Sequence, residues 1–87
     1  MDHAVTAVDI RQWLAAYLSS LLEIPECDVD TSMPFEQFGL DSAAAVAMTG
    51  DLAKRLGVEL DPDLAIRHRT IDAVSVHLAE RMRDRVP

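Results

Sequence analysis

The sequence predicts an all-α protein, a bundle of four helices with a long first loop and a short third helix, in a single domain over residues 1–87. Three observations predict this. Apolar residues recur at intervals of three and four along most of the chain. Capping residues precede these segments, and glycine or proline follows the first two. No stretch of useful length alternates apolar and polar residues as a half-buried strand would.

The first helix is expected over residues 7–23. Thr6 followed by Asp9 resembles a capping box in which Asp replaces the usual Glu, and Pro25 would end the helix. The apolar positions of the segment fall on one face, which indicates core packing rather than a ligand site. They are Ile10, Trp13, Leu14, Tyr17, Leu18, Leu21 and Leu22.

The connection over residues 24–41 is long for so small a domain. It contains prolines, Gly39 and several acidic residues, so it is not expected to form a long helix. A loop of this length needs apolar residues that anchor it to the core. The candidates are Val29, Met33, Phe35, Phe38 and Leu40.

The second helix is expected over residues 42–56, with Gly57 as a left-handed stop. One stripe suits the core and contains Ala45, Met48, Thr49, Leu52 and Leu56. The opposite side is also small or apolar. Full burial is hard to arrange in so small a bundle, so this second face is expected to meet a partner; a fully buried, alanine-rich helix is the alternative. The face contains Ala43, Val46, Ala47 and Gly50.

Two further helices complete the bundle. Asp61 and Pro62 resemble an N-cap followed by proline at the first helical position, and predict a short helix over residues 61–66. Thr70 caps the last helix, over residues 70–83. Its buried stripe is Ile71, Val74, Leu78 and Met82.

Charge and cysteine content narrow the classes of function. The chain has 15 acidic and 8 basic residues, a net charge of −7, and residues 23–63 alone carry −8. Nucleic-acid binding is not expected, because phosphate contacts need clustered Lys and Arg. An acidic middle favours either a basic protein partner or a merely solvated surface. The one cysteine, Cys27, excludes a disulfide framework and suits a reducing compartment.

No apolar run approaches the roughly 20 residues of a membrane helix, and the N-terminus lacks a secretory pattern. We therefore expect a cytoplasmic protein without a membrane partner. The chain start at Met1, and its end soon after the last helix, favour a free-standing domain, although an excised domain of a larger protein would look much the same.

Metal and hydrolase sites are not expected. His3, His68 and His77 lack metal-ligand spacing, and the segment after Asp28 begins like a calcium loop but lacks the required glycine and glutamate. Ser42 lies outside any G-x-S-x-G pattern, and no strand precedes it.

The residues Gly39-Leu40-Asp41-Ser42 lie at the junction of the long loop and the second helix. Here the chain resembles the acyl carrier proteins, whose signature G-x-D-S-L opens the second helix of a four-helix bundle. The resemblance covers most of the chain, from the pattern of the first helix to the capped start of the last.

The resemblance implies that the Ser42 hydroxyl receives 4′-phosphopantetheine from coenzyme A through a separate transferase. Acyl groups would then be carried as thioesters on the thiol of this arm, so the protein would be a carrier and not an enzyme. Asp41 would be a recognition or positioning acid. A helix start favours a phosphate, whereas a plain N-cap is the alternative role for Ser42.

Departures from the family pattern affect docking. The signature leucine is replaced by Ala43, a common glutamate by Ala47, and the proline often found before Thr70 is absent. We therefore expect partner enzymes to dock on the apolar face of the second helix, with acidic residues at its rim. The rim candidates are Glu36, Asp41, Asp51, Asp61 and Asp63.

The resemblance is to carriers of polyketide-type or related fatty-acid pathways, because Leu40 argues against the Gly-Gly signature of peptidyl carriers. The implied partners are a phosphopantetheinyl transferase, an acyl-loading enzyme (an acyltransferase or acyl-AMP ligase) and a ketosynthase or other synthase enzymes, with the carrier itself a monomer. Alternatives are a peptidyl carrier of a nonribosomal peptide pathway and a helical interaction domain without a prosthetic group. Small side chains at Ala44 and Ala45 would leave room beneath the second helix, where part of an acyl chain could shelter.

Overall fold

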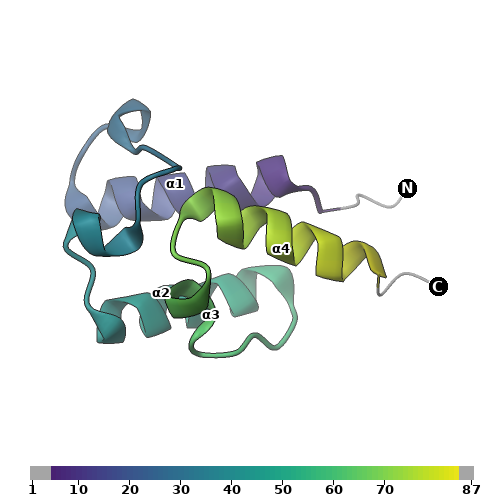
Figure 1. Ribbon diagram of the computed structural model, residues 1–87. Helices are drawn as coiled ribbons and strands as arrows, with labels where there is room; N and C mark the ends of the chain where they lie inside the picture. The colour runs from purple at the N-terminus through teal and green to yellow at the C-terminus, as the bar shows by residue number, and fades with distance from the viewer. Residues whose placement is uncertain (1–4, 85–87) are drawn as a thin grey trace.

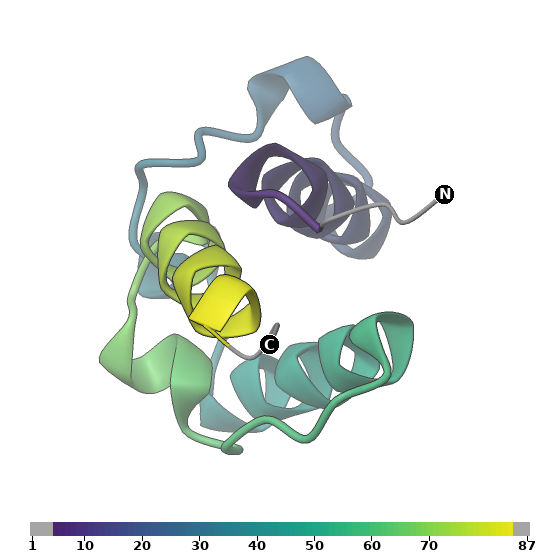
Figure 2. The same cartoon turned by 90° about the vertical axis from the view of Figure 1, so that its right-hand side faces the viewer.

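The computed structural model describes residues 5–84, which form four α-helices and two short 3-10 helices without a strand. Figures 1 and 2 show the long helices α1, α2 and α4 around a common core, with α1 beside α4 and the short α3 against α2. The predicted all-α bundle is confirmed. In order, the elements are α1 (Ala7–Leu22), η1 (Glu26–Asp28), η2 (Phe35–Phe38), α2 (Ser42–Leu56), α3 (Leu64–Arg67) and α4 (Ile71–Asp84).

The core is built from the predicted stripes of the three long helices, except that Met82, predicted to be buried, is half-buried in the last turns of α4. One expectation for α1 is wrong, because Leu21 is 51% exposed. It lies in the last turn, where Leu22 and Ile24 take the positions packed against the core. The most deeply buried apolar side chains are Ile10, Leu14, Leu18, Met48, Leu52, Ile71, Val74 and Leu78.

Both ends of α1 follow from local hydrogen bonds. The predicted capping box is present: the Thr6 N–H donates to the Asp9 carboxylate at 3.0 Å, and the Asp9 N–H donates to the Thr6 hydroxyl at 3.2 Å. The helix ends one residue earlier than predicted, because Glu23 adopts a left-handed conformation with φ 57°. Pro25 therefore follows the stop and does not cause it.

The start predicted for the third helix is wrong. The Leu64 N–H donates to the Asp61 carbonyl at 3.0 Å, which closes a turn, and α3 begins only at Leu64. The Asp61 carboxylate does not cap the helix, because it accepts a hydrogen bond from Arg67 at 3.0 Å. The predicted cap of α4 is confirmed, since the Ala73 N–H donates to the Thr70 hydroxyl at 3.0 Å.

The long connection is fixed to the start of α4. The Phe35 N–H donates to the Arg69 carbonyl at 2.7 Å, and the Asp72 N–H donates to the Thr31 carbonyl at 3.0 Å. Of the predicted anchors, Val29, Phe35 and Leu40 are buried, and Met33 and Phe38 are half-buried. The connection therefore holds the residues that precede α2 in a defined place.

Candidate functional site

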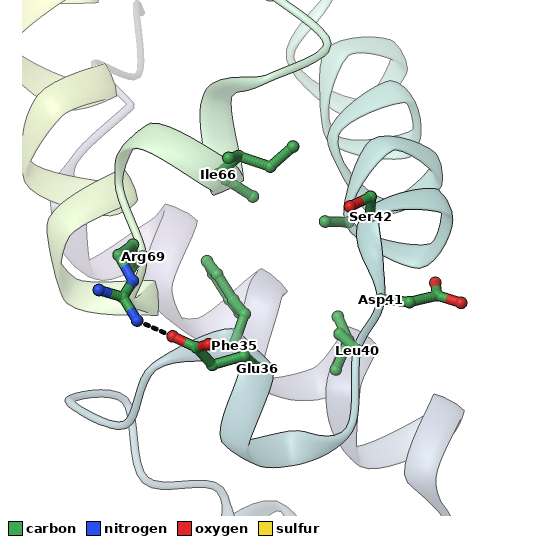
Figure 3. A pocket seen from close by; sticks show the side chains of 9 residues that line it. Phe35, Glu36, Leu40, Asp41, Ser42, Ile66 and Arg69 are labelled. Atoms are coloured by element: carbon green, nitrogen blue, oxygen red, sulfur yellow. Dashed lines mark ion pairs between the residues drawn. The ribbon is translucent and has the colours of Figure 1, made fainter.

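Ser42 is the first residue of α2, at the tip of the helix where the long connection ends. Its side chain is exposed, and within residues 5–84 its hydroxyl has no hydrogen-bond partner. Figure 3 shows the hydroxyl directed toward the side on which Ile66 of α3 lies. A separate protein can therefore reach this oxygen without displacing any part of the fold.

Asp41, and not Ser42, caps α2. The Asp41 carboxylate accepts a hydrogen bond from the Ala44 N–H at 2.8 Å, and the Asp41 carbonyl accepts the first helical bond from Ala45 at 3.0 Å. The alternative role of Ser42 as a plain N-cap is thus wrong. Asp41 therefore stabilises the start of the helix, whereas its role in recognition stays a prediction.

The turn into α2 depends on Gly39 and Leu40. Gly39 ends η2 with φ 87°, a left-handed conformation that side chains rarely adopt, although no atom lies within 4 Å of where a Cβ would be. Leu40 is 9% exposed and packs into the core directly before Asp41. Together they direct the chain so that Asp41 and Ser42 emerge at the surface.

A pocket of about 250 Å³ lies beside Ser42, between η2, the start of α2 and α3. Figure 3 shows Arg69 and Glu36 paired on the side of the pocket opposite Ser42, while the Asp41 carboxylate points away from them. The lining is apolar apart from these charged groups and the Ser42 hydroxyl. It consists of Phe35, Glu36, Leu40, Asp41, Ser42, Ala45, Ala65, Ile66 and Arg69.

The acids predicted at the docking rim mostly have partners within the chain. Glu36 forms its ion pair with Arg69. Asp61 and Asp63 both pair with Arg67, at 3.0 and 3.4 Å. These exposed pairs leave less free negative charge near Ser42 than the sequence indicates.

Asp51, the remaining rim candidate, accepts a hydrogen bond from the Tyr17 hydroxyl at 2.9 Å. Partial burial raises the pKa of Tyr17, and the Asp51 carboxylate raises it further. The Tyr17 ring stacks on Trp13, with ring centroids 5.3 Å apart. The two aromatic side chains lie half-buried against the core, as core residues do. The hydrogen bond between Tyr17 and Asp51 joins α1 to α2.

The outer face of α2 is exposed, as predicted from its small and apolar residues. Val46 is 41% exposed, and no heavy atom lies within 4 Å of a Cβ built on Gly50. Together with Ala43 and Ala47, these positions form an uncharged strip that begins one residue after Ser42. The alternative of a fully buried α2 is wrong.

His68 and His77, the two histidines that the structure describes, make no hydrogen bond to Ser42. His68 and His77 stack on each other with ring centroids 4.0 Å apart. Burial lowers the pKa of His77, and the neighbouring His68, Arg81 and Arg67 lower it further, whereas Glu80 raises it. The Ser42 hydroxyl has no hydrogen-bonded histidine in the described chain, so the site lacks the base of a serine hydrolase.

Within residues 5–84 two further features are absent. No cluster of three or more His, Cys, Asp or Glu side chains is arranged to hold a metal ion. No helix has the length and apolar character needed to cross a membrane. His3 lies outside the described residues.

Sequence reasoning did not assign a role to Arg69 or Ile66. Both belong to the stretch before Thr70 that departs from the family pattern, and this departure was the available signal. Only the folded chain brings them to the same pocket as Ser42, because η2, α2 and α3 contribute separate parts of its wall.

Comparisons with known proteins agree with one another. Residues 12–78 match the family model described as "Phosphopantetheine attachment site". The chain is 38% identical to the acyl carrier protein TtuC of Teredinibacter turnerae, over 93% of each sequence. It is 30% identical to part of a phenolphthiocerol/phthiocerol polyketide synthase of Mycobacterium tuberculosis, with 85% of this chain aligned.

The aligned part is 4% of that synthase, so the chain matches one small domain of a much larger protein. Among solved structures, the solution structure of Asl1650, an acyl carrier protein from Anabaena with a variant phosphopantetheinylation-site sequence, superposes with a TM-score of 0.84. It is 30% identical, and the match covers 93% of this chain and 92% of that one.

Proposed function

The chain belongs to the family of carrier proteins with a phosphopantetheine attachment site, and on this premise we propose that Ser42 is the residue that bears the group. Carriers of this family are not enzymes. The covalent 4′-phosphopantetheine supplies a flexible arm whose thiol holds acyl groups as thioesters. One relative is an acyl carrier protein and another is a polyketide synthase, and the chain is an acyl carrier of the polyketide type.

The observation that carries the assignment is the position of Ser42. Its exposed hydroxyl has no partner in the described chain and lies at the first position of α2. The N–H groups of Ser42 and Ala43 also lack intrahelical partners, because the first turn of any helix leaves its N–H groups free. A phosphate on Ser42 would lie next to these donors and at the positive end of the helix dipole. The residues present therefore fit the group.

The attachment step needs little chemistry from this chain. The Ser42 oxygen would form a bond to the phosphorus that carries the pantetheine, while the pyrophosphate bond of coenzyme A breaks and adenosine 3′,5′-bisphosphate leaves. The hydroxyl proton passes to a base of the transferase. The absence of a histidine hydrogen-bonded to Ser42 within residues 5–84 suits this division of labour.

We further propose the partners and the surface they use. The transferase must approach Ser42 first, followed by an acyl-loading enzyme and then by a ketosynthase or another synthase enzyme. The uncharged strip of Ala43, Val46, Ala47 and Gly50 borders Ser42 and suits an apolar docking contact. Glu36, Asp41, Asp51, Asp61 and Asp63 remain candidates for its rim, with the internal pairs described above.

Mass spectrometry tests the assignment. Incubation with coenzyme A and a broad-specificity phosphopantetheinyl transferase should add one phosphopantetheine to the wild-type chain and none to Ser42→Ala. Ser32→Ala, at another serine of the same chain, is the matched control and should load like the wild type. An unmodified wild type, or an adduct that survives in Ser42→Ala, would exclude the assignment. Which adenylating or acyl-transferring enzyme then charges the arm separates an acyl carrier from a peptidyl one.

A further inference from the structure

The pocket beside Ser42 has an apolar floor and an exposed apolar edge. Phe35, Ala45 and Ala65 are 4%, 6% and 4% exposed, so its inner wall is the surface of the core. Ile66, at the edge, is 49% exposed although it is a large apolar residue. A partly open apolar hollow next to an attachment point favours a ligand group that carries methyl groups.

The charged side of the pocket offers hydrogen-bond donors. Arg69 and Glu36 form an ion pair there, with side chains 63% and 62% exposed. A guanidinium has five N–H donors, and one carboxylate does not occupy all of them. Because Arg69 lines the pocket, it can keep its pair with Glu36 and still donate a hydrogen bond to a neutral carbonyl oxygen there.

We propose that this pocket seats the segment of the phosphopantetheine arm nearest to Ser42, and that Arg69 is its positioning residue. The inference rests on the proposed function. Beyond its phosphate the arm has a carbon with two methyl groups, then a hydroxyl and an amide. The methyl groups suit the apolar wall and Ile66, and the amide carbonyl suits the donors of Arg69.

The size of the pocket limits what it holds. Its volume of about 250 Å³ is roughly eight times the volume of a water molecule in the liquid. This is enough for the dimethyl, hydroxyl and first amide part of the arm, and the thiol end stays outside. The free, thiol-bearing part of a seated arm would therefore start beside α3, and a partner enzyme would have to pull the arm out of the pocket.

Nuclear magnetic resonance on the loaded protein tests this directly. In the wild type loaded from coenzyme A, we expect nuclear Overhauser effects between the arm's methyl protons and the methyl groups of Ile66 and Ala65. Arg69→Ala should lower the equilibrium constant for seating of the arm roughly two- to tenfold, the factor that one hydrogen bond contributes, and the Overhauser effects should weaken as the seated fraction falls. Arg67→Ala is the matched control, because Arg67 is similarly exposed and paired but lies outside the pocket.

A second pair of variants tests the apolar edge. Ile66→Ser should also weaken the Overhauser effects to the Ala65 methyl group, whereas Val76→Ser, at a 51% exposed valine on α4, should not. Equal losses in Arg69→Ala and Arg67→Ala, or spectral changes confined to Ser42 and Ala43, would overturn the pocket assignment. If the wild type does not accept the arm, the proposed function is contradicted. If the arm is attached but makes no contacts in the pocket, only this inference is contradicted.

Discussion

Replacement of Asp41 separates its structural task from its predicted role in recognition. The carboxylate accepts a hydrogen bond from the Ala44 N–H at 2.8 Å, and Asp41→Ala leaves that donor to water. Loss of such a cap costs about 1 kcal/mol of unfolding free energy, which lowers the melting temperature of a domain of this size by roughly 4–8 °C. Asp41→Asn keeps the acceptor oxygen and removes only the charge, whose interaction with the helix dipole is about 0.3–1 kcal/mol at low salt and less at high salt.

Urea unfolding followed by circular dichroism, in moderate salt, measures both variants. We expect Asp41→Asn to lie close to the wild type and Asp41→Ala to be clearly less stable. Thr70→Ala is the matched control, because Thr70 caps α4 through the same kind of bond to Ala73 at 3.0 Å. If Asp41→Asn loses as much stability as Asp41→Ala while Thr70→Ala behaves as expected, the reasoning from the hydrogen bond is refuted.

The same pair of variants then measures recognition. Because Asp41→Asn keeps the cap, any loss of kcat/KM for phosphopantetheine transfer in this variant reports the charge itself. We expect a lower kcat/KM for Asp41→Asn than for the wild type, as predicted for a recognition acid. An unchanged value would assign Asp41 to the helix alone.

Three other changes have defined outcomes. Val46→Asp should lower kcat/KM for phosphopantetheine transfer by about tenfold, the effect of losing one important interface side chain, and should leave the helicity unchanged. Val76→Asp on α4 is the control and should transfer normally. Equal rates for the two variants would contradict docking on α2. Gly50→Ala should raise the unfolding free energy by about 0.5–1 kcal/mol in urea titrations, because the position is helical and open to solvent, and a loss of stability would mean that the space is not open. Because the pKa of His77 is lowered in the folded chain, the unfolded chain takes up the His77 proton at a higher pH than the folded chain does, near the ordinary value of 6.5. The unfolding free energy should therefore decrease as the pH falls below that value. In unfolding measured at several pH values, His77→Gln should weaken this dependence, and a pH profile identical to that of the wild type would argue against the reasoning.

The local signals in the sequence predict the helices well. The capping box at Thr6 and Asp9 and the cap at Thr70 are each complete within four residues, so neighbouring chain segments do not alter them. The apolar stripes likewise need only helical periodicity. Ser42 could be placed at the start of α2 for the same reason, because the turn chemistry of Gly39 is local.

The features that sequence reasoning missed depend on tertiary contacts. A cap on α3 is predicted at Asp61, but the guanidinium of Arg67 competes for its carboxylate and the backbone closes a turn instead. The predicted acidic rim treats Glu36 as free charge, whereas Arg69 reaches it only after the long connection has docked on the start of α4. A pattern along the chain does not contain these pairings.

The arrangement at Ser42 explains how a serine can be modified without cost to the fold. Had Ser42 capped α2, a phosphodiester on its oxygen would have removed the bond that holds the first turn. Asp41 makes that bond instead, and the Ser42 hydroxyl has no partner in the described chain. The proposed modification would therefore break no hydrogen bond of the described chain, and it would add negative charge where the helix dipole favours it. Under the proposed function the two neighbouring residues have separate roles: Asp41 stabilises the helix, and Ser42 stays available to the transferase.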